Sequence, residues 1–282
     1  MSVPARLAGF MAALAVVFGA TVGIGRIVGP THRAEKQKRH GADAMAMEGD
    51  HAAAPQGLAV DNGRFRLVAG TAGFIAGRPA TFRFRIVDNR GRTVRGFELE
   101  HTRKLHLIVV RRDLTGYQHL HPTEHPDGSW SVPLTFATAG TYRVFTDFTA
   151  KGAERATLGT DVMVPGSSSA VPLPAPVRSA SVDGYDVAIG STAGQGTERE
   201  MAFTVTRGGR PVKVQPYLGA DGHLVVLRQG DLAYLHAHPD EEGGGGPIRF
   251  MVDYPSAGTY RLFLQFKHEG TVHTAAFTQE VQ

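Results

Sequence analysis

The chain has 282 residues, 42% of them hydrophobic and 20% charged, which is enough for two ordinary domains with buried cores. The formal net charge is only +4 and no basic face alternates with aromatic residues, so nucleic-acid binding is excluded. The chain has no cysteine, which excludes disulfides, thiolate zinc sites and blue-copper sites.

The first predicted element is an apolar stretch from Leu7 to Gly25 that carries no charge and lies between Arg6 and Arg26. It is long enough to cross a bilayer as a helix. A cleaved secretory signal is the alternative, but the nearest Ala-x-Ala motif begins only at Ala42. We therefore expect residues 1–28 to form an N-terminal membrane anchor, with a signal segment as the alternative.

The flanking charges and the expected topology disagree. More basic residues follow the apolar stretch than precede it, which by the positive-inside rule places the C-terminal bulk in the cytoplasm. We nevertheless expect a single-pass protein of the cell membrane whose C-terminal domains lie outside the cytoplasm. An anchored pair of β modules is the usual layout of an envelope protein.

Residues 29–57 are predicted to be a flexible tether, because they contain little that could pack. His40, Met45, Met47 and His51 lie close together in it. Thioethers select Cu(I) and imidazoles suit Cu(II), so the tether could bind copper. The alternative is a solvated linker in which these residues are incidental.

The first predicted domain covers residues 58–165 and consists of short strands with alternating apolar residues, separated by turns. The expected strands are 64–68, 80–87, the two strands of a hairpin in 104–122, then 130–136, 141–148 and 156–164, and residues 93–100 lead to the hairpin. A linker rich in proline and serine follows at 166–181.

The second predicted domain covers residues 182–282 and repeats this plan, with strands at 185–189, 201–206, 249–252, 259–266 and 272–281 around a second hairpin. The sequence thus predicts an all-β protein of two tandem immunoglobulin-like β-sandwiches after an N-terminal transmembrane helix.

A repeated histidine motif dominates the sequence. Each hairpin has one histidine on its first strand and a His-x-His-Pro motif on its second, at the same spacing in both copies. The histidines are His106, His119 and His121 in the first copy and His223, His236 and His238 in the second. A later Ala-Gly-Thr-Tyr-Arg motif, at Ala139 and Ala257, also recurs. A repeat of this length indicates a duplicated domain.

Side chains two apart on a strand share a face, so each His-x-His pair points to one side. A two-residue turn at Gln229–Gly230 would place His223 opposite His236, with His238 on the diagonal. Three neutral imidazoles would then converge in each repeat. Such a triad can bind copper or zinc, with one coordination position left open.

The alternative is that these histidines are hydrogen-bonded structural residues at the end of the hairpin, where the following proline ends the strand. Ile108, Val110 and Tyr117 on the same face are predicted to be core. The histidines without a counterpart in the other repeat are expected on the surface: His101, His125, His268 and His273. Tyr142 and Tyr260 are predicted to be packing residues.

No reaction is predicted. A histidine-only zinc site could activate water, but the sequence has no general base at a fixed spacing in both repeats, no Gly-x-Ser-x-Gly elbow and no phosphate loop.

The segment from Asp113-Leu114 through Tyr117 to His119-Leu-His-Pro122, with the later Gly140 to Arg143 motif, resembles a motif of bacterial secreted or membrane-anchored β-sandwich proteins. Some of these proteins are labelled heavy-metal-binding. The sandwich class and the His and Met residues are also similar to periplasmic copper-carrier proteins. The resemblance covers both domains and implies an envelope location and metal binding.

The sequence therefore predicts a membrane-anchored extracytoplasmic protein that binds copper or another divalent transition metal through a His triad in each repeat, for metal buffering or resistance. The expected partners are the metal ion and the membrane, without nucleic acid, and no protein partner is predicted. The alternative is a structural or interaction module of the cell envelope that binds no metal.

Overall fold

The computed structural model describes residues 55–70, 73–190, 198–235, 237–239 and 246–282. Within these ranges every regular element is a β-strand, and no helix is long and apolar enough to span a membrane. The predicted anchor and most of the predicted tether lie outside the described residues.

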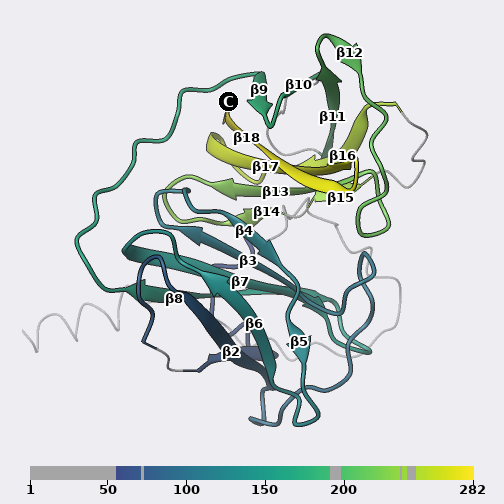
Figure 1. The fold of residues 1–282 in the computed structure, drawn as a ribbon. Coiled ribbons are helices and arrows are strands. Elements are labelled where there is room, and N and C mark those ends of the chain that lie inside the picture. The colour runs from purple at the N-terminus through teal and green to yellow at the C-terminus, as the bar shows by residue number, and fades with distance from the viewer. Residues whose placement is uncertain (1–54, 71–72, 191–197, 236, 240–245) are drawn as a thin grey trace, which may run out of the picture. The chain divides into compact units, whose positions relative to one another are not determined.

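The first domain is a sandwich of two four-stranded antiparallel sheets (Figure 1). One sheet has the order β1-β2-β6-β5 and the other the order β4-β3-β7-β8. The strands are β1 (Phe65–Ala69), β2 (Pro79–Asp88), β3 (His106–Arg111), β4 (Gln118–Leu120), β5 (Thr123–Glu124), β6 (Trp130–Thr135), β7 (Gly140–Thr149) and β8 (Arg155–Val164). Alternate residues of β1 and β2, such as Leu67, Phe82 and Phe84, fill the core between the sheets.

The second domain repeats this topology. One sheet has the order β15-β16-β11-β10-β9, with β12 paired to β11, and the other has the order β14-β13-β17-β18. The strands are β9 (Ser179–Val182), β10 (Tyr185–Ile189), β11 (Glu198–Arg207), β12 (Arg210–Pro211), β13 (Gly222–Arg228), β14 (Tyr234–Leu235), β15 (Ala237–Pro239), β16 (Ile248–Asp253), β17 (Gly258–His268) and β18 (Thr271–Val281).

Both domains have the strand order of an immunoglobulin sandwich. The sheets correspond to A-B-E-D and C′-C-F-G, with β3 and β13 as strand C and β7 and β17 as strand F. The hydroxyl of Tyr142 donates to the carbonyl of Thr138 at 2.9 Å, and Tyr260 donates to Ser256 at 2.8 Å. These are the tyrosine corners typical of this fold. The prediction that both tyrosines are packing residues is confirmed, since both are buried.

A third apolar cluster lies between the two domains. The sheet of β3, β4 and β7 contacts the sheet of β13, β14 and β17 through Ile108, Val110, Leu114, Phe145, Val225, Leu227, Leu232, Tyr234 and Phe263. Because of this docking, β3 is buried on both faces, as is most of β13. Ile108 and Val110 are thus core as predicted, but they belong to a core between two domains.

The docking contacts are symmetric in sequence. Tyr117 stacks on Phe263 with centroids 4.0 Å apart, and its counterpart Tyr234 packs on Phe145, the counterpart of Phe263, at 5.6 Å. The two repeats therefore present the same surface to each other, as two subunits do across a two-fold axis.

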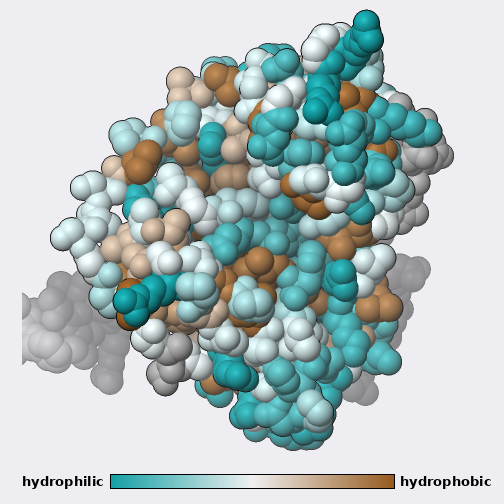
Figure 2. All heavy atoms as spheres, viewed as in Figure 1, coloured by the Kyte–Doolittle hydropathy of each residue, from teal (hydrophilic) through white to brown (hydrophobic). Residues whose placement is uncertain are grey.

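On the outer face shown in Figure 2, polar residues predominate and apolar residues form small separate groups.

Two connecting segments pack against the domains. Residues 93–100, which lead to the first hairpin, form isolated bridges, including Phe97 with Ala150, and not a strand. The residues predicted as linker are partly ordered against the domains. Ser169 accepts a hydrogen bond from Arg111 at 2.7 Å, Val171 donates to Asp113 at 2.8 Å, and β9 begins at Ser179.

Candidate metal centre

The first hairpin brings its three histidines together. β3 and β4 pair with Ile108 opposite His119, a register that places His106 opposite residue 121 when it is continued. One nitrogen each from His106, His119 and His121 can be chosen so that all three lie within 4.8 Å of one another. The ring centroids of the three pairs are 5.2, 5.1 and 4.8 Å apart. The predicted convergence of three imidazoles thus exists in the first repeat.

The outer nitrogens of two rings contact oxygen acceptors. His106 Nε2 lies 3.1 Å from the carbonyl oxygen of Glu100, and His119 Nδ1 lies 2.7 Å from Oε1 of Gln265. The Nε2 of the same Gln265 amide donates to the Thr274 hydroxyl at 3.2 Å. With the amide in this orientation both oxygens can only accept, so both outer ring nitrogens carry the hydrogen.

The inner nitrogens of the same two rings face each other. His106 Nδ1 and His119 Nε2 are 2.9 Å apart. A neutral imidazole has one N–H, and each ring uses it on the outer side, so both inner nitrogens carry lone pairs. A third candidate ligand atom, Nε2 of His121, is buried and has no hydrogen-bond partner among the described residues. The cluster therefore presents several lone pairs to one small volume.

Burial keeps these rings neutral. Loss of water around His119 lowers its pKa to about 3, with further lowering by the neighbouring rings of His106 and His121. Burial lowers the pKa of His121 to about 4 and also lowers that of His106. An extra proton that would bridge the facing lone pairs is thus disfavoured at neutral pH.

The second copy does not reproduce this arrangement. β13 and β14 pair with Val226 opposite Leu235, which is the register of the first hairpin, so the predicted register with His223 opposite residue 236 is wrong. The turn spans four residues instead of two, because Asp231 accepts hydrogen bonds from Arg228 and from the Ala233 amide.

After Leu235 the chain changes sheets. Ala237–Pro239 pairs with β16 of the outer sheet, and His238 is exposed there. His223 lies on β13 of the inner sheet, so these two predicted ligands belong to different sheets. His236 lies outside the described residues.

His223 lies beside the first cluster instead. Its ring centroid is 5.8 Å from that of His106 and 5.7 Å from that of His119. Its Nε2 is buried without a hydrogen-bond partner among the described residues, and burial strongly lowers its pKa. The sequence carries a signal for the burial of His223. The residues of β13 are apolar without alternating polar residues, which indicates a strand that is covered on both faces.

The prediction that the unmatched histidines lie on the surface is wrong for His273, which is buried, whereas His101, His125 and His268 are partly exposed. His101 is half-buried and its ring lies 4.9 Å from that of His223. His273 is buried and its Nδ1 is 2.8 Å from Asp183. His101 reaches the cluster because it and Thr102 adopt left-handed backbone conformations, with φ of 48° and 66°. No residue pattern indicates such a turn for non-glycine residues.

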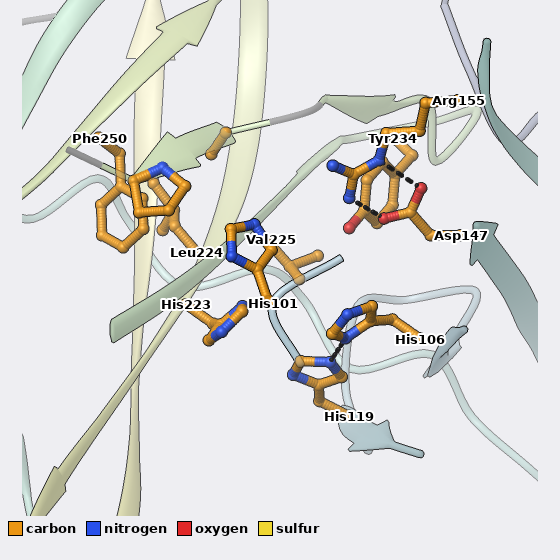
Figure 3. Close-up of a pocket in the computed structure, with 12 residues that line it drawn as sticks. His101, His106, His119, Asp147, Arg155, His223, Leu224, Val225, Tyr234 and Phe250 are labelled. Carbon is orange, nitrogen blue, oxygen red and sulfur yellow. Dashed lines mark hydrogen bonds and ion pairs between the residues drawn. The ribbon is translucent and has the colours of Figure 1, made fainter. Parts of the chain in front are cut away.

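A pocket of about 20 Å³ adjoins the cluster, enough for one water-sized occupant. Figure 3 shows His101, His106, His119 and His223 on one side of it, with the Asp147–Arg155 ion pair on another. Arg155 Nε donates to Asp147 at 2.9 Å, and Thr157 donates to the same carboxylate at 3.1 Å. The buried charge beside the histidines is therefore already compensated.

The topology and this cluster define a class of protein: a tandem immunoglobulin-like β-sandwich with a candidate metal centre where its two domains meet. Residues 59–164 and 180–282 each match the family described as "Domain of unknown function (DUF8832)". The chain belongs to this family, which is present in it twice. No curated protein matches the chain.

Several solved structures are similar to parts of the chain at low identity. They include the Escherichia coli adhesin FdeC (18% identity, 77% of this chain and 64% of that chain, TM-score 0.25). Yersinia pseudotuberculosis InvD is 12% identical over 77% of this chain and 58% of that chain, with a TM-score of 0.26. The Ig1-2 module of Drosophila DLAR is 8% identical over 78% and 99%, with a TM-score of 0.22. At these TM-scores the likeness carries no argument about function.

Proposed function

We propose that the protein binds one divalent transition metal ion, Cu(II) or Zn(II), through His106, His119 and His121. The observation that carries the proposal is the pair of inner nitrogens that face each other at 2.9 Å while both outer nitrogens contact oxygen acceptors. Histidines that bind metal donate their other N–H to a carbonyl or carboxylate in this way.

A cation resolves the conflict between the facing lone pairs. Two lone pairs at this distance repel unless a proton or a metal ion lies between or beside them, and burial disfavours the proton. Nitrogens bound to one tetrahedral zinc ion at 2.0–2.1 Å are roughly 3.3 Å apart, close to the observed separation. The three ligand nitrogens lie within 4.8 Å of one another, so the rings must come closer by up to about 1.5 Å to bind one ion.

The donor set selects the kind of metal. The three ligands are neutral imidazoles, with no thiolate and no carboxylate among them. Imidazole suits Cu(II) and Zn(II), whereas Ca²⁺ and Mg²⁺ require oxygen ligands. Metal buffering or resistance by an anchored extracytoplasmic protein remains the proposed role, with residues 1–28 as the proposed anchor.

The proposal concerns one site per chain. A second triad of His223, His236 and His238 stays a prediction from the sequence, because His236 lies outside the described residues. Its other two members belong to different sheets. The described residues therefore favour a stoichiometry of one metal ion per chain, which is one ion for the two repeats.

One observation favours the second candidate function, a structural module of the envelope. If the Gln265 amide rotated, the His106–His119 contact would be an ordinary N–H···N hydrogen bond, and the chain from Glu100 to Thr274 would only pin the hairpin. The buried unpartnered nitrogens of His121 and His223 argue against this candidate, since such groups cost free energy.

The deciding experiment is a calorimetric titration of the full chain with Zn(II) and with Cu(II). We expect one ion to bind and the binding to be lost in the double variant His119→Gln, His121→Gln. His125→Gln is the matched control, because the His125 ring contacts Ser131 at 2.7 Å and is not among the clustered rings. A folded wild-type chain that binds neither metal at this site would leave the structural candidate as the function.

A further inference from the structure

The second domain contributes one ring to the cluster of the first. His223 is buried on β13, and its Nε2 has no hydrogen-bond partner among the described residues. A buried imidazole nitrogen with no partner is costly. A ligand bound to this nitrogen would offset that cost and explain why the buried histidine is retained.

The ring separations fit a common ion. Imidazoles on one tetrahedral ion have centroids roughly 5 Å apart, given metal–nitrogen bonds of 2.0–2.1 Å. The three rings of the first domain are 4.8–5.2 Å apart, and His223 lies 5.7–5.8 Å from two of them. The centroid of His223 is thus less than 1 Å farther from these two rings than this distance. The nitrogens that lie within 4.8 Å of one another are those of His106, His119 and His121, so the ring of His223 must move towards them to bind the same ion.

We propose that His223 is the fourth ligand of the metal site, so that a bound ion joins the two immunoglobulin-like domains and locks them together. This inference rests on the proposed metal site and adds to it the source of the fourth ligand and its consequence. A fourth imidazole closes the coordination shell, as in structural zinc sites, and leaves no position for substrate.

A second contact across the domains supports the inference. His119 belongs to the first domain, but its Nδ1–H is held by Gln265 on β17 of the second, at 2.7 Å. The ring is thus oriented correctly only when the domains are docked. Outer contacts of this kind are typically worth about 10- to 100-fold in metal affinity.

Metal binding and domain docking are therefore coupled, and the coupling is reciprocal. Whatever weakens the docking weakens metal binding, and the metal strengthens the docking. The docking itself rests on the apolar cluster between the domains, in which Phe263 stacks on Tyr117. Phe263 thus affects the metal site without being a ligand.

The test measures zinc affinity and zinc-induced thermal stabilisation of the full chain in four variants. His223→Gln removes the ligand and Gln265→Ala the outer contact, and each is expected to lower affinity by at least about tenfold. Phe263→Ala is expected to lower affinity as well, although it removes no nitrogen. His238→Gln is the matched control, from the same motif but exposed on β15.

A second control separates docking from general destabilisation. Val281→Ala truncates a buried residue in the core of the second domain, away from the cluster between the domains, and should leave zinc affinity unchanged. Zinc should also slow proteolysis of the segment between the domains, around residues 165–178, in the wild type but not in His223→Gln.

The outcomes distinguish the two proposals. If the wild type binds no metal, the proposed function fails and this inference fails with it. If the wild type binds zinc and the first three variants bind it equally well, the site belongs to the first domain alone, and only the fourth ligand is overturned. Loss of binding in His238→Gln would overturn it too, because it would place the ligand set in the second repeat.

Discussion

The two histidine hairpins have nearly the same sequence but different surroundings. In the first, β4 continues along β3 to Leu120, and the histidines of both strands meet. In the second, β14 ends at Leu235 and the chain passes to the outer sheet, so His238 leaves the cluster. A sequence motif can thus place candidate ligands on one face of a strand, but the pairing of that strand decides whether the ligands come together.

The two repeats also differ beside the histidines. Asp147 lies opposite His106 on β7, and the equivalent residue opposite His223 on β17 is Gln265. Asp147 is buried in an ion pair with Arg155, whereas Gln265 of the second domain forms a hydrogen bond with His119 of the first domain. Duplication therefore preserved the scaffold, while the equivalent residues Asp147 and Gln265 make different contacts beside the histidine cluster.

The largest expected effect comes from this pair. Asp147→Ala removes the buried carboxylate that Arg155 and Thr157 contact, while Glu100 stays 3.9 Å from Arg155, and should lower the free energy of unfolding by about 3–5 kcal/mol. Gln265→Ala loses one hydrogen bond to His119 and should cost about 1 kcal/mol. Denaturant unfolding of both variants measures the difference, and equal costs would contradict the distinction between the copies.

Gly159 provides the next comparison, because its counterpart in the second repeat is Ala276. A Cβ at Gly159 would overlap the carbonyl oxygen of Gly57 and crowd the guanidinium of Arg143. Gly159→Ala should therefore cost about 3 kcal/mol through overpacking. Ala276→Gly is the reverse change and should cost no more than about 1 kcal/mol. Thermal unfolding compares them, and a silent Gly159→Ala would show that the segment around Gly57 moves easily.

The pH dependence of stability should come mainly from the first hairpin. Burial lowers the pKa of His119 to about 3 and that of His121 to about 4, below the unfolded value of 6.5. The unfolded chain therefore binds more protons below pH 6.5, and stability is full above that value and falls as the pH drops towards the folded values.

Between pH 6.5 and 5 the loss should be about 2 kcal/mol for the two groups together, after allowance for their partial exposure. Denaturant unfolding of the chelator-treated chain measures it. The double variant His119→Gln, His121→Gln should flatten the profile. A profile unaffected by the double variant would show that other groups set the acid sensitivity.

The smallest expected effect should be the same in both repeats. Tyr142→Phe and Tyr260→Phe each remove a hydroxyl that donates to a backbone carbonyl and also contacts the side chain of the same residue, Thr138 or Ser256. Each should cost about 1 kcal/mol. Because both hydroxyls donate to a carbonyl four residues upstream, the two costs should agree within error. A clear difference between the two losses of unfolding free energy, measured with denaturant, would mean that the two tyrosine corners have also diverged between the repeats.

Much of the fold was predictable from the sequence, because alternating apolar residues report directly which face of a strand is buried. Tyr185–Ile189 is a strand with the predicted bounds, and most others differ by one or two residues. The register of the second hairpin was not predictable, since the Arg228–Asp231 ion pair sets the turn and not the Gln229–Gly230 step. His101 was missed because its left-handed backbone leaves no mark in the sequence.

The sequence by itself determined that the chain is duplicated, that each copy is a β-sandwich, and that histidines on one face of the first hairpin converge. These properties depend on contacts between neighbours along the chain or across one hairpin. Only the tertiary structure decided that His223 joins His106 and His119, because they belong to strands of different domains. Their meeting depends on two sheets docking through an apolar face, and no local pattern encodes which distant surfaces pack together.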